Sequence, residues 1–371
     1  MVSDSRGSAG SRSRGPPGRS GPGPPPAAAA AAAAGGGPGP ERPGGPRLRL
    51  PALPRLSETT HISTRARVVA VGDVHGDYEK TVAALRLSGC LGVGDTGDAQ
   101  WTGGDTVLVQ LGDILDRGDR ELAILSLLQL LQRQARAAGG DVLLMNGNHE
   151  SLNVMGDFRY VTPGGFSEST QVVRQSSGLP DSFGQTWEEQ LKSRLALFSP
   201  GGPIARQLAQ HYTVVQVNDT VFAHGGLLPS HVKYGVGKLN DAVTGWMAGE
   251  KGGEEEQDAL MRALGGSDSV MWNRTFGKEH YASRVESYEA TRKLSQMLDL
   301  IGARRLVVGH TPQQQGLNEC FGGQVWRADV GMSSGVLGAP PQVLEILPGP
   351  AGGTASSKIS ILTEEGAIRK E

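Results

Sequence analysis

The chain has 371 residues, a formal net charge of −2 and only two cysteines, Cys90 and Cys320. The first 50 residues, rich in Gly, Pro, Ala and Arg, have seven arginines against two acidic residues, so they carry a net charge of +5 and leave −7 for the remainder. A mildly acidic body argues against a nucleic-acid-binding protein, and two cysteines form neither a disulfide framework nor a zinc-ligand motif.

Residues 1–62 are predicted to be a disordered tail, because they have too few large apolar side chains to offset the entropy lost on ordering. The tail is basic and nearly free of acidic residues, as an organelle transit peptide is, and its prolines favour a chloroplast address over a mitochondrial one. A plain extension on a cytoplasmic protein is the alternative. Residues 63–365 are predicted to be one domain, followed by a short C-terminal tail at 366–371. Since no long apolar run is present, neither a transmembrane helix nor a membrane partner is expected.

Short apolar runs alternate with amphipathic ones from the start of the domain. Strands are predicted at Val68 to Val71, Thr106 to Leu111 and Val142 to Met145. Helices follow the first two strands; Asp77 is a good N-cap for the first helix, and the second ends at Gly139-Gly140. These β-α units predict a parallel layer with helical crossovers.

The second half of the chain is less regular. Helices are predicted at 187–198, 203–210 and 283–301, a β-hairpin at 212–223, and a strand at 306–308. Residues 227–282, rich in glycine and charge, are predicted to be connecting structure. The last segments, 324–328, 343–347 and 359–362, alternate like an antiparallel edge.

Five predicted strand ends supply Asp, His or Asn, usually beside glycine. The residues are Asp73, His75, Asp113, Asn148, His224 and His310. Ligand sites in open α/β sheets lie at the carboxyl ends of strands, and two ions that share a bridging carboxylate would use six such ligands. Imidazole and carboxylate ligands suit Mn, Fe or Zn and not Cu(I). Each motif alone would be a turn or a helix cap, but together they predict a site for two divalent metal ions.

The motifs GDVHG, GDILDRG, GNHE and HGG resemble the signature motifs of PPP-type phosphoprotein phosphatases, within the calcineurin-like metallophosphoesterase fold. The longer stretches WTGGDTVLVQLGDILDRGDRELAILSLL, MNGNHESLNVMGDFRYVT and WRADVGMSSGVLGAPPQVLEI are similar to the Shewanella-like phosphatases of plants and algae, nearest their plastid branch. The resemblance implies an α/β fold with a central β-sandwich flanked by helices, in which the parallel layer is one sheet of two and the dimetal site lies at the C-terminal ends of the strands.

The resemblance also implies a role for each residue of the site. Asp73 and His75 would bind one metal ion, Asp113 would bridge both, and Asn148, His224 and His310 would bind the second. His149 would be the general acid, oriented by Asp116. Arg117 would bind the substrate phosphate, and Arg274, in Trp-Asn-Arg, resembles the family's second phosphate-binding arginine. Glu150 is expected to be a structural ion-pair partner without a catalytic role.

The predicted function is metal-dependent hydrolysis of phosphoserine and phosphothreonine in proteins by a hydroxide that bridges the two ions, without a phosphoenzyme. The sequence does not exclude phosphotyrosine. One alternative is a hydrolase of dinucleotide polyphosphates, although Asp-Arg-Gly in GDILDRG and Glu in GNHE favour the protein phosphatase. Another is a non-catalytic scaffold, which the presence of all six ligands, His149 and Asp116 disfavours. A phosphoprotein substrate is the expected partner, and the sequence identifies no regulatory subunit.

Overall fold

The computed structural model describes residues 60–349 and 357–370. Most of the predicted tail, together with its chloroplast address, therefore lies outside the described residues and stays a prediction. No helix among the described residues is long and apolar enough to cross a membrane.

One six-stranded sheet, sheet B, contains the predicted parallel layer. Its strand order is β14-β13-β12-β2-β5-β6. Strands β2 (Val68–Val71), β5 (Val107–Gln110) and β6 (Asp141–Leu144) run parallel, which confirms the prediction. They consist mostly of apolar residues because both faces of this sheet are covered. Strands β12 (Val343–Leu347), β13 (Lys358–Thr363) and β14 (Gly366–Lys370) extend the sheet in antiparallel fashion.

The second six-stranded sheet, sheet A, has the order β1-β7-β8-β9-β11-β10. The predicted hairpin is β7 (Val214–Val217) and β8 (Thr220–Ala223), and β9 (Arg305–Val308) lies parallel to β8. The edges are β1 (His61–Ile62) and β10 (Asn318–Cys320). Strand β11 (Val325–Arg327) lies parallel to β9, so its prediction as part of an antiparallel edge with 343–347 is wrong. Alternating burial identifies a strand but not its partner.

The two sheets pack face to face, as the resemblance implied. Val215, Phe222 and Val307 of sheet A share one core with sheet B. Their neighbours Val221 and Leu306 point the other way and pack in a second core with residues of the helices that cover sheet A. This alternation is typical of a β-sandwich whose outer faces are covered by helices.

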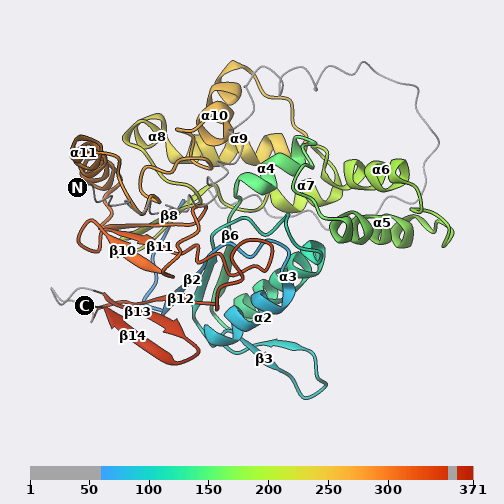
Figure 1. Ribbon diagram of the computed structural model, residues 1–371, viewed down its shortest axis with the longest axis horizontal. Coiled ribbons are helices and arrows are strands. Elements are labelled where there is room, and N and C mark those ends of the chain that lie inside the picture. The colour runs from blue at the N-terminus through green and yellow to red at the C-terminus, as the bar shows by residue number, and fades with distance from the viewer. Residues whose placement is uncertain (1–59, 350–356, 371) are drawn as a thin grey trace, which may run out of the picture.

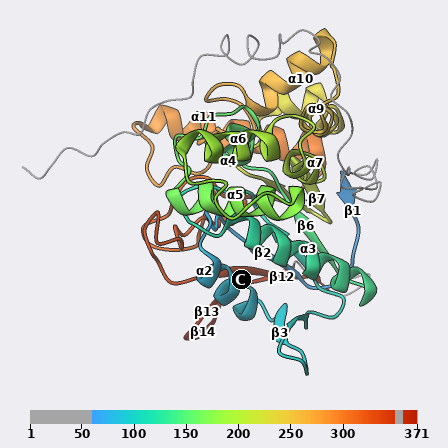
Figure 2. The same cartoon turned by 90° about the vertical axis from the view of Figure 1, so that its right-hand side faces the viewer.

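Helices cover both outer faces of the sandwich (Figures 1 and 2). On sheet B lie α2 (Tyr78–Leu87) and α3 (Glu121–Ala137), with the hairpin β3 (Leu91–Val93) and β4 (Ala99–Trp101) below them. The others are α4 (Asn148–Val154), α5 (Pro163–Ser177), α6 (Trp187–Phe198), α7 (Pro203–Leu208), α8 (Pro229–Tyr234), α9 (Val236–Ala248), α10 (Glu254–Leu264) and α11 (Arg284–Ile301). Asp77 caps α2 and Gly302 ends α11, as predicted.

Both predicted boundaries of the domain differ from the structure. Residues 366–370, predicted to be a tail, form β14, in which Ile368 pairs with Ile361 of β13. At the other end, His61 and Ile62 pair with β7. Backbone hydrogen bonds join these edge strands to the sheets, and because β14 is exposed throughout, its sequence lacks the burial pattern that predicts a strand.

Candidate metal and phosphate site

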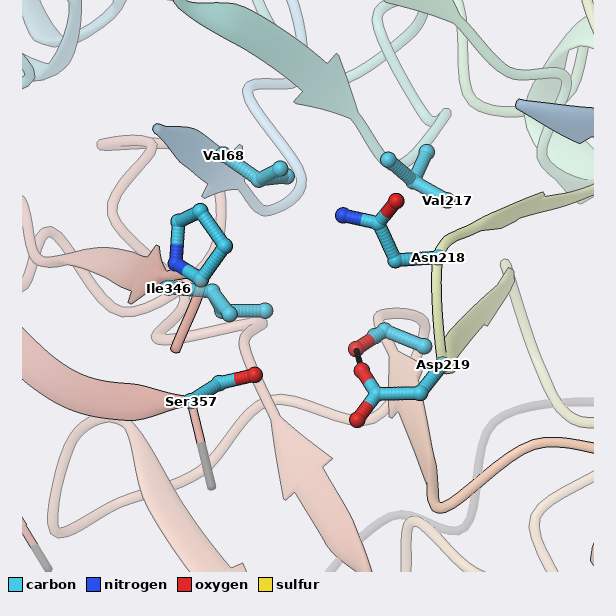
Figure 3. Close-up of a pocket in the computed structure, with 8 residues that line it drawn as sticks. Val68, Val217, Asn218, Asp219, Ile346 and Ser357 are labelled. Carbon is cyan, nitrogen blue, oxygen red and sulfur yellow. Dashed lines mark hydrogen bonds between the residues drawn. The ribbon is translucent and has the colours of Figure 1, made fainter. Parts of the chain in front are cut away.

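A small pocket lies where the start of β2 meets the β7–β8 turn and the end of β12 (Figure 3). It is lined by Val68, Val217, Asn218 and Ile346, among others, and contains none of the predicted ligands. The ligands instead follow the opposite, carboxyl ends of β2, β5 and β6 in sheet B and of β8 and β9 in sheet A. The structure gathers there six buried side chains, Asp73, His75, Asp113, Asn148, His224 and His310.

Asp113 lies at the centre of this cluster. Its Oδ2 is 3.6 Å from Nε2 of His75 and 3.9 Å from Nε2 of His149, whereas its Oδ1 is 3.3 Å from Nε2 of His224. Two groups of ligand atoms result, Asp113 with His75 and His149, and Asp113 with His224 and His310; within each group all atoms lie within 4.8 Å of one another. One carboxylate shared between two such groups is the arrangement that a bridging ligand requires.

Backbone carbonyls orient two of the imidazoles. Nδ1 of His75 donates to the carbonyl of Leu115 at 3.0 Å, and Nδ1 of His224 donates to the carbonyl of Leu111 at 2.8 Å. When Nδ1 is the donor, Nε2 of the neutral ring keeps its lone pair for a metal ion. Nε2 of His224 is also 3.0 Å from Oδ1 of Asn148, so the amide oxygen faces the same space.

Two buried atoms of the cluster, Oδ1 of Asp73 and Nε2 of His310, have no hydrogen-bond partner among the described residues. Asp73 belongs to neither group of three, but its Oδ2 accepts a hydrogen bond from the His310 amide at 3.0 Å, which leaves Oδ1 free. Unpaired buried polar atoms are costly, and a bound cation would satisfy both. The side chains present therefore fit divalent metal ions.

The backbone of the site is strained. Positive φ angles of 41–68° occur at His75, Asp113, Asp116, Arg117 and His310, and elsewhere in the described chain only two non-glycine residues have positive φ. Each such residue costs roughly 1–3 kcal/mol, and strain of this kind clusters at active sites. Glycine permits the close approach of the loops, since a Cβ on Gly118 would overlap the backbone of His75 and Gly76.

Glu150 holds the loops after β5 and β6 together. Its Oε1 accepts hydrogen bonds from the amides of Ile114 and Leu115, and its Oε2 accepts them from the amides of Asp113 and Gly147, all at 2.6–3.0 Å. Burial and the charge of Asp113 raise the pKa of Glu150 to about 7. Glu150 is structural, but the expected ion pair is wrong: its partners in the described chain are backbone amides.

His149 and Asp116 form a buried pair in which Nδ1 of His149 lies 2.5 Å from Oδ2 of Asp116. Burial would lower the pKa of His149, but the charges of Asp113 and Asp116 and the hydrogen bond to Asp116 raise it above its usual value. His149 therefore holds its proton more tightly than an imidazole in water does. By contrast, burial lowers the pKa of His75 to about 4 and that of His310 well below its usual value, so both rings are neutral and can bind a metal ion.

Two arginines lie near the site, Arg117 beside His75 and His149 and Arg274 beside Asp113 and His310. The amide of Arg117 donates to the carbonyl of Tyr160 at 3.0 Å, its guanidinium carbon is 5.1 Å from the centre of the Tyr160 ring, and its buried Nε has no partner among the described residues. Arg274 is exposed, and the charges of Asp113 and Arg117 both act on its guanidinium. Two neighbouring guanidinium groups can bind the oxygens of a phosphate dianion.

Two residues of the site were not among those predicted from the sequence. Asp329 follows β11, is buried beside Asp73, and accepts a hydrogen bond from the Gly331 amide at 2.8 Å. Burial raises the pKa of Asp329 to about 6. Its position directly after a predicted strand was a signal that could have identified it. Tyr160, whose ring centre is 5.0 Å from that of His149, lies in a loop with no such signal.

Proteins similar to this chain define its family. Residues 66–314 match the family model of the calcineurin-like phosphoesterases. Shewanella-like protein phosphatase 2 of Arabidopsis thaliana is 40% identical over 77% of this chain and 76% of the relative. Shewanella-like protein phosphatase 1 of Plasmodium berghei is 30% identical over 68% of this chain and 63% of the relative.

The fold agrees with a solved structure. The cold-active protein-tyrosine phosphatase of a psychrophilic Shewanella species superimposes with a TM-score of 0.61 and 22% identity, over 85% of this chain and 84% of that chain. The chain belongs to the calcineurin-like phosphoesterases and is a metal-dependent phosphoesterase. Within that family it is one of the Shewanella-like protein phosphatases, which confirms the predicted resemblance.

Proposed function

We propose that this phosphoesterase is a protein phosphatase that hydrolyses phosphoserine and phosphothreonine. The observation that supports this best is the buried His149–Asp116 pair beside the ligand groups that share Asp113. The names of the relatives from Arabidopsis thaliana and Plasmodium berghei support a protein substrate.

Two divalent ions, with Mn, Fe or Zn the best fit to the ligands, would be held by the six predicted side chains, with Asp113 shared. When bound, such ions would supply a water molecule of lowered pKa and neutralise charge on the phosphate. Arg117 and Arg274 would orient the phosphate through guanidinium hydrogen bonds.

His149 would donate a proton from Nε2 to the leaving oxygen, while Asp116 holds Nδ1–H and stabilises the charged ring. This proton matters most when the leaving group is a poor one. The alkoxide of serine or threonine is a far poorer leaving group than the phenolate of tyrosine, whose conjugate acid has a pKa of about 10. A buried imidazole with a raised pKa therefore favours alkyl phosphate esters as substrates.

Metal-restored hydrolysis of phosphopeptides tests the proposal. The full chain is stripped with a chelator, and Mn, Fe, Zn or Mg is added back singly. Rates are then compared for phosphoserine, phosphothreonine and phosphotyrosine peptides and for a dinucleotide polyphosphate. We expect metal-restored activity that is highest on phosphoserine and phosphothreonine peptides.

Three other outcomes would contradict this proposal. Strong preference for the dinucleotide would assign the same metal core to a different phosphoester, and strong preference for phosphotyrosine would remove the serine and threonine assignment. Bound metal without hydrolysis of any phosphomonoester would favour the scaffold alternative.

A further inference from the structure

A buried polar network connects helix α6 to the His149–Asp116 pair. We propose that Arg194 of α6 is a positioning residue for His149, acting through Asn153 and Asp116 without contacting the substrate. This inference rests on the proposed role of His149 as general acid.

Arg194 is a fully buried cation with hydrogen-bond partners on three sides. Its Nε and Nη2 donate to Oδ1 of Asn153 at 3.0 and 2.7 Å, and its Nη1 donates to Oε2 of Glu121 at 2.7 Å. Nη1 also lies 3.1 Å from the Ser169 hydroxyl, and the guanidinium carbon lies 4.4 Å from the centre of the Phe198 ring. A buried charge is tolerated only when it is paired and hydrogen-bonded, so these contacts leave the guanidinium one orientation.

The first connection between Arg194 and His149 is the side chain of Asn153, which lies four residues after His149 on α4. Because Oδ1 of Asn153 accepts two hydrogen bonds from Arg194, its Nδ2 must point the other way. There Nδ2 donates to Oδ1 of Asp116 and to the carbonyl of His149, both at 2.9 Å. A flipped amide would place two N–H groups against the guanidinium. Arg194 thus sets the direction in which Asn153 donates.

The second connection is Glu121 at the start of α3. One of its oxygens binds Arg194, and the other accepts a hydrogen bond from the Asp116 amide at 2.5 Å. The backbone of Asp116 has a φ of 68°, a conformation that persists only when neighbouring groups hold it. Arg194 therefore acts on the Asp116 side chain through Asn153 and on the Asp116 backbone through Glu121. Its Nη2 also lies 3.9 Å from Oδ1 of Asp116, so the two charges attract each other directly. The other carboxylate oxygen of Asp116 then holds Nδ1 of His149.

A positioning role makes a prediction that a purely structural role does not. If Arg194 orients the proton donor, its loss slows esters with poor leaving groups and spares those that need no proton. General loss of structure would slow all esters alike. The test therefore compares a phosphoserine peptide with 2,4-dinitrophenyl phosphate on the full chain supplied with Mn, and metal content is measured for every variant.

Arg194→Met keeps the bulk of the side chain and removes its charge, whereas Arg194→Lys keeps the charge and removes the planar fork. We expect Arg194→Met to lower kcat on the phosphoserine peptide by ~10²-fold, the lower end of what a positioned acid supplies, and to leave KM and the dinitrophenyl ester nearly unchanged. Arg194→Lys should recover part of the loss. Glu168→Gln is the matched control, since Glu168 of α5 binds the amides of Leu122 and Ala123 in the same layer without contacting the pair.

A second readout needs no metal ion. In the metal-free full chain, the short hydrogen bond between His149 and Asp116 should give a downfield proton resonance, assigned by its absence in His149→Asn. We expect this resonance to shift or broaden in Arg194→Met and to stay in place in Glu168→Gln.

Equal loss on both esters, or an unchanged resonance, would overturn the inference about Arg194. If His149→Asn still distinguishes the two esters in that case, the proposed function stands. If His149→Asn itself slows both esters equally, the proposed function fails. If Arg194→Met does not fold, Arg194→Lys decides. Slowing of the phosphoserine peptide alone supports the inference. Parent-like rates on both esters, or equal slowing of both, contradict it.

Discussion

Oδ1 of Asp113 lies 3.3 Å from Nε2 of His224, while Oδ2 of the same carboxylate faces His75. Asp113→Asn removes the negative charge that both ligand groups share. We expect both metal ions to bind at least ~10²-fold more weakly. Mutating a residue that only hydrogen-bonds to a metal ligand already lowers metal affinity by up to that factor, and Asp113 would be a ligand itself. Metal content after dialysis and calorimetric titration measure the effect. The exposed Asp98→Asn is the control, and two tightly bound ions in Asp113→Asn would contradict a shared ligand.

His149→Asn should keep the fold and the metal ions and lose most turnover. A positioned acid supplies ~10²–10⁴-fold in rate, so kcat on a phosphoserine peptide should fall by that factor. Steady-state kinetics with metal analysis provide the measurement, and His61→Asn, at an exposed histidine, is the matched control. Unchanged turnover in His149→Asn would remove this residue from the acid role.

Glu150→Gln should destabilise the loops that hold the ligands. The carboxylate accepts four backbone hydrogen bonds, and an amide would direct its N–H groups at some of these donors. Leaving buried donors unpaired costs roughly 1–3 kcal/mol each, so the melting temperature of the metal-free chain should fall. Glu79→Gln, which alters an exposed ion pair with Arg120, should change it little. An unaltered melting temperature in Glu150→Gln would show that the loops do not depend on Glu150.

Acid should destabilise the metal-free chain through His211, a buried histidine that is not one of the predicted ligands. Burial lowers the pKa of His211 to about 3 in the folded chain, against about 6.5 when unfolded. Because the folded pKa is the lower one, this contribution to stability is complete above pH 6.5 and is lost as the pH falls toward 3. Between pH 7.5 and 5.5 the free energy of unfolding should drop by about 1.4 kcal/mol from this residue.

Urea unfolding at the two pH values measures this drop, and His211→Gln should reduce the dependence on pH. Some dependence should remain, because burial also lowers the pKa of His75 and that of His231 to about 4 and the pKa of His310 well below its usual value. The same slope in His211→Gln and in the parent chain would contradict the assignment.

Much of the fold and the ligand cluster follows from local patterns. Asp73, Asp113 and His224 each lie within three residues of the end of an apolar strand and beside glycine, and such turns are visible in the sequence alone. Strand ends in parallel layers meet at one edge, so these side chains could be brought together before any coordinates were known.

What the sequence did not reveal depends on contacts between distant residues. Arg194 and Asn153 lie in ordinary helices 41 positions apart, and only tertiary packing brings them together. Helix α9 contains Gly237 and Gly245, whose low helix propensity argues against a helix in the sequence. The helix forms because its packing against sheet A outweighs that preference. Helix α10, by contrast, has three glutamates in its first turn, which is a sequence signal for the start of a helix.

The division of the ligands between two sheets has a consequence for the whole molecule. Ions bound between the ends of β2, β5 and β6 in one sheet and of β8 and β9 in the other would hold the two sheets together. Metal affinity and resistance to unfolding would then be thermodynamically linked. A packing defect on a strand that supplies no ligand, for example at Ile361 of β13, would then be detected as a higher metal requirement. A variant that is inactive in dilute metal can therefore be a folding variant, and excess metal would distinguish it from a catalytic variant.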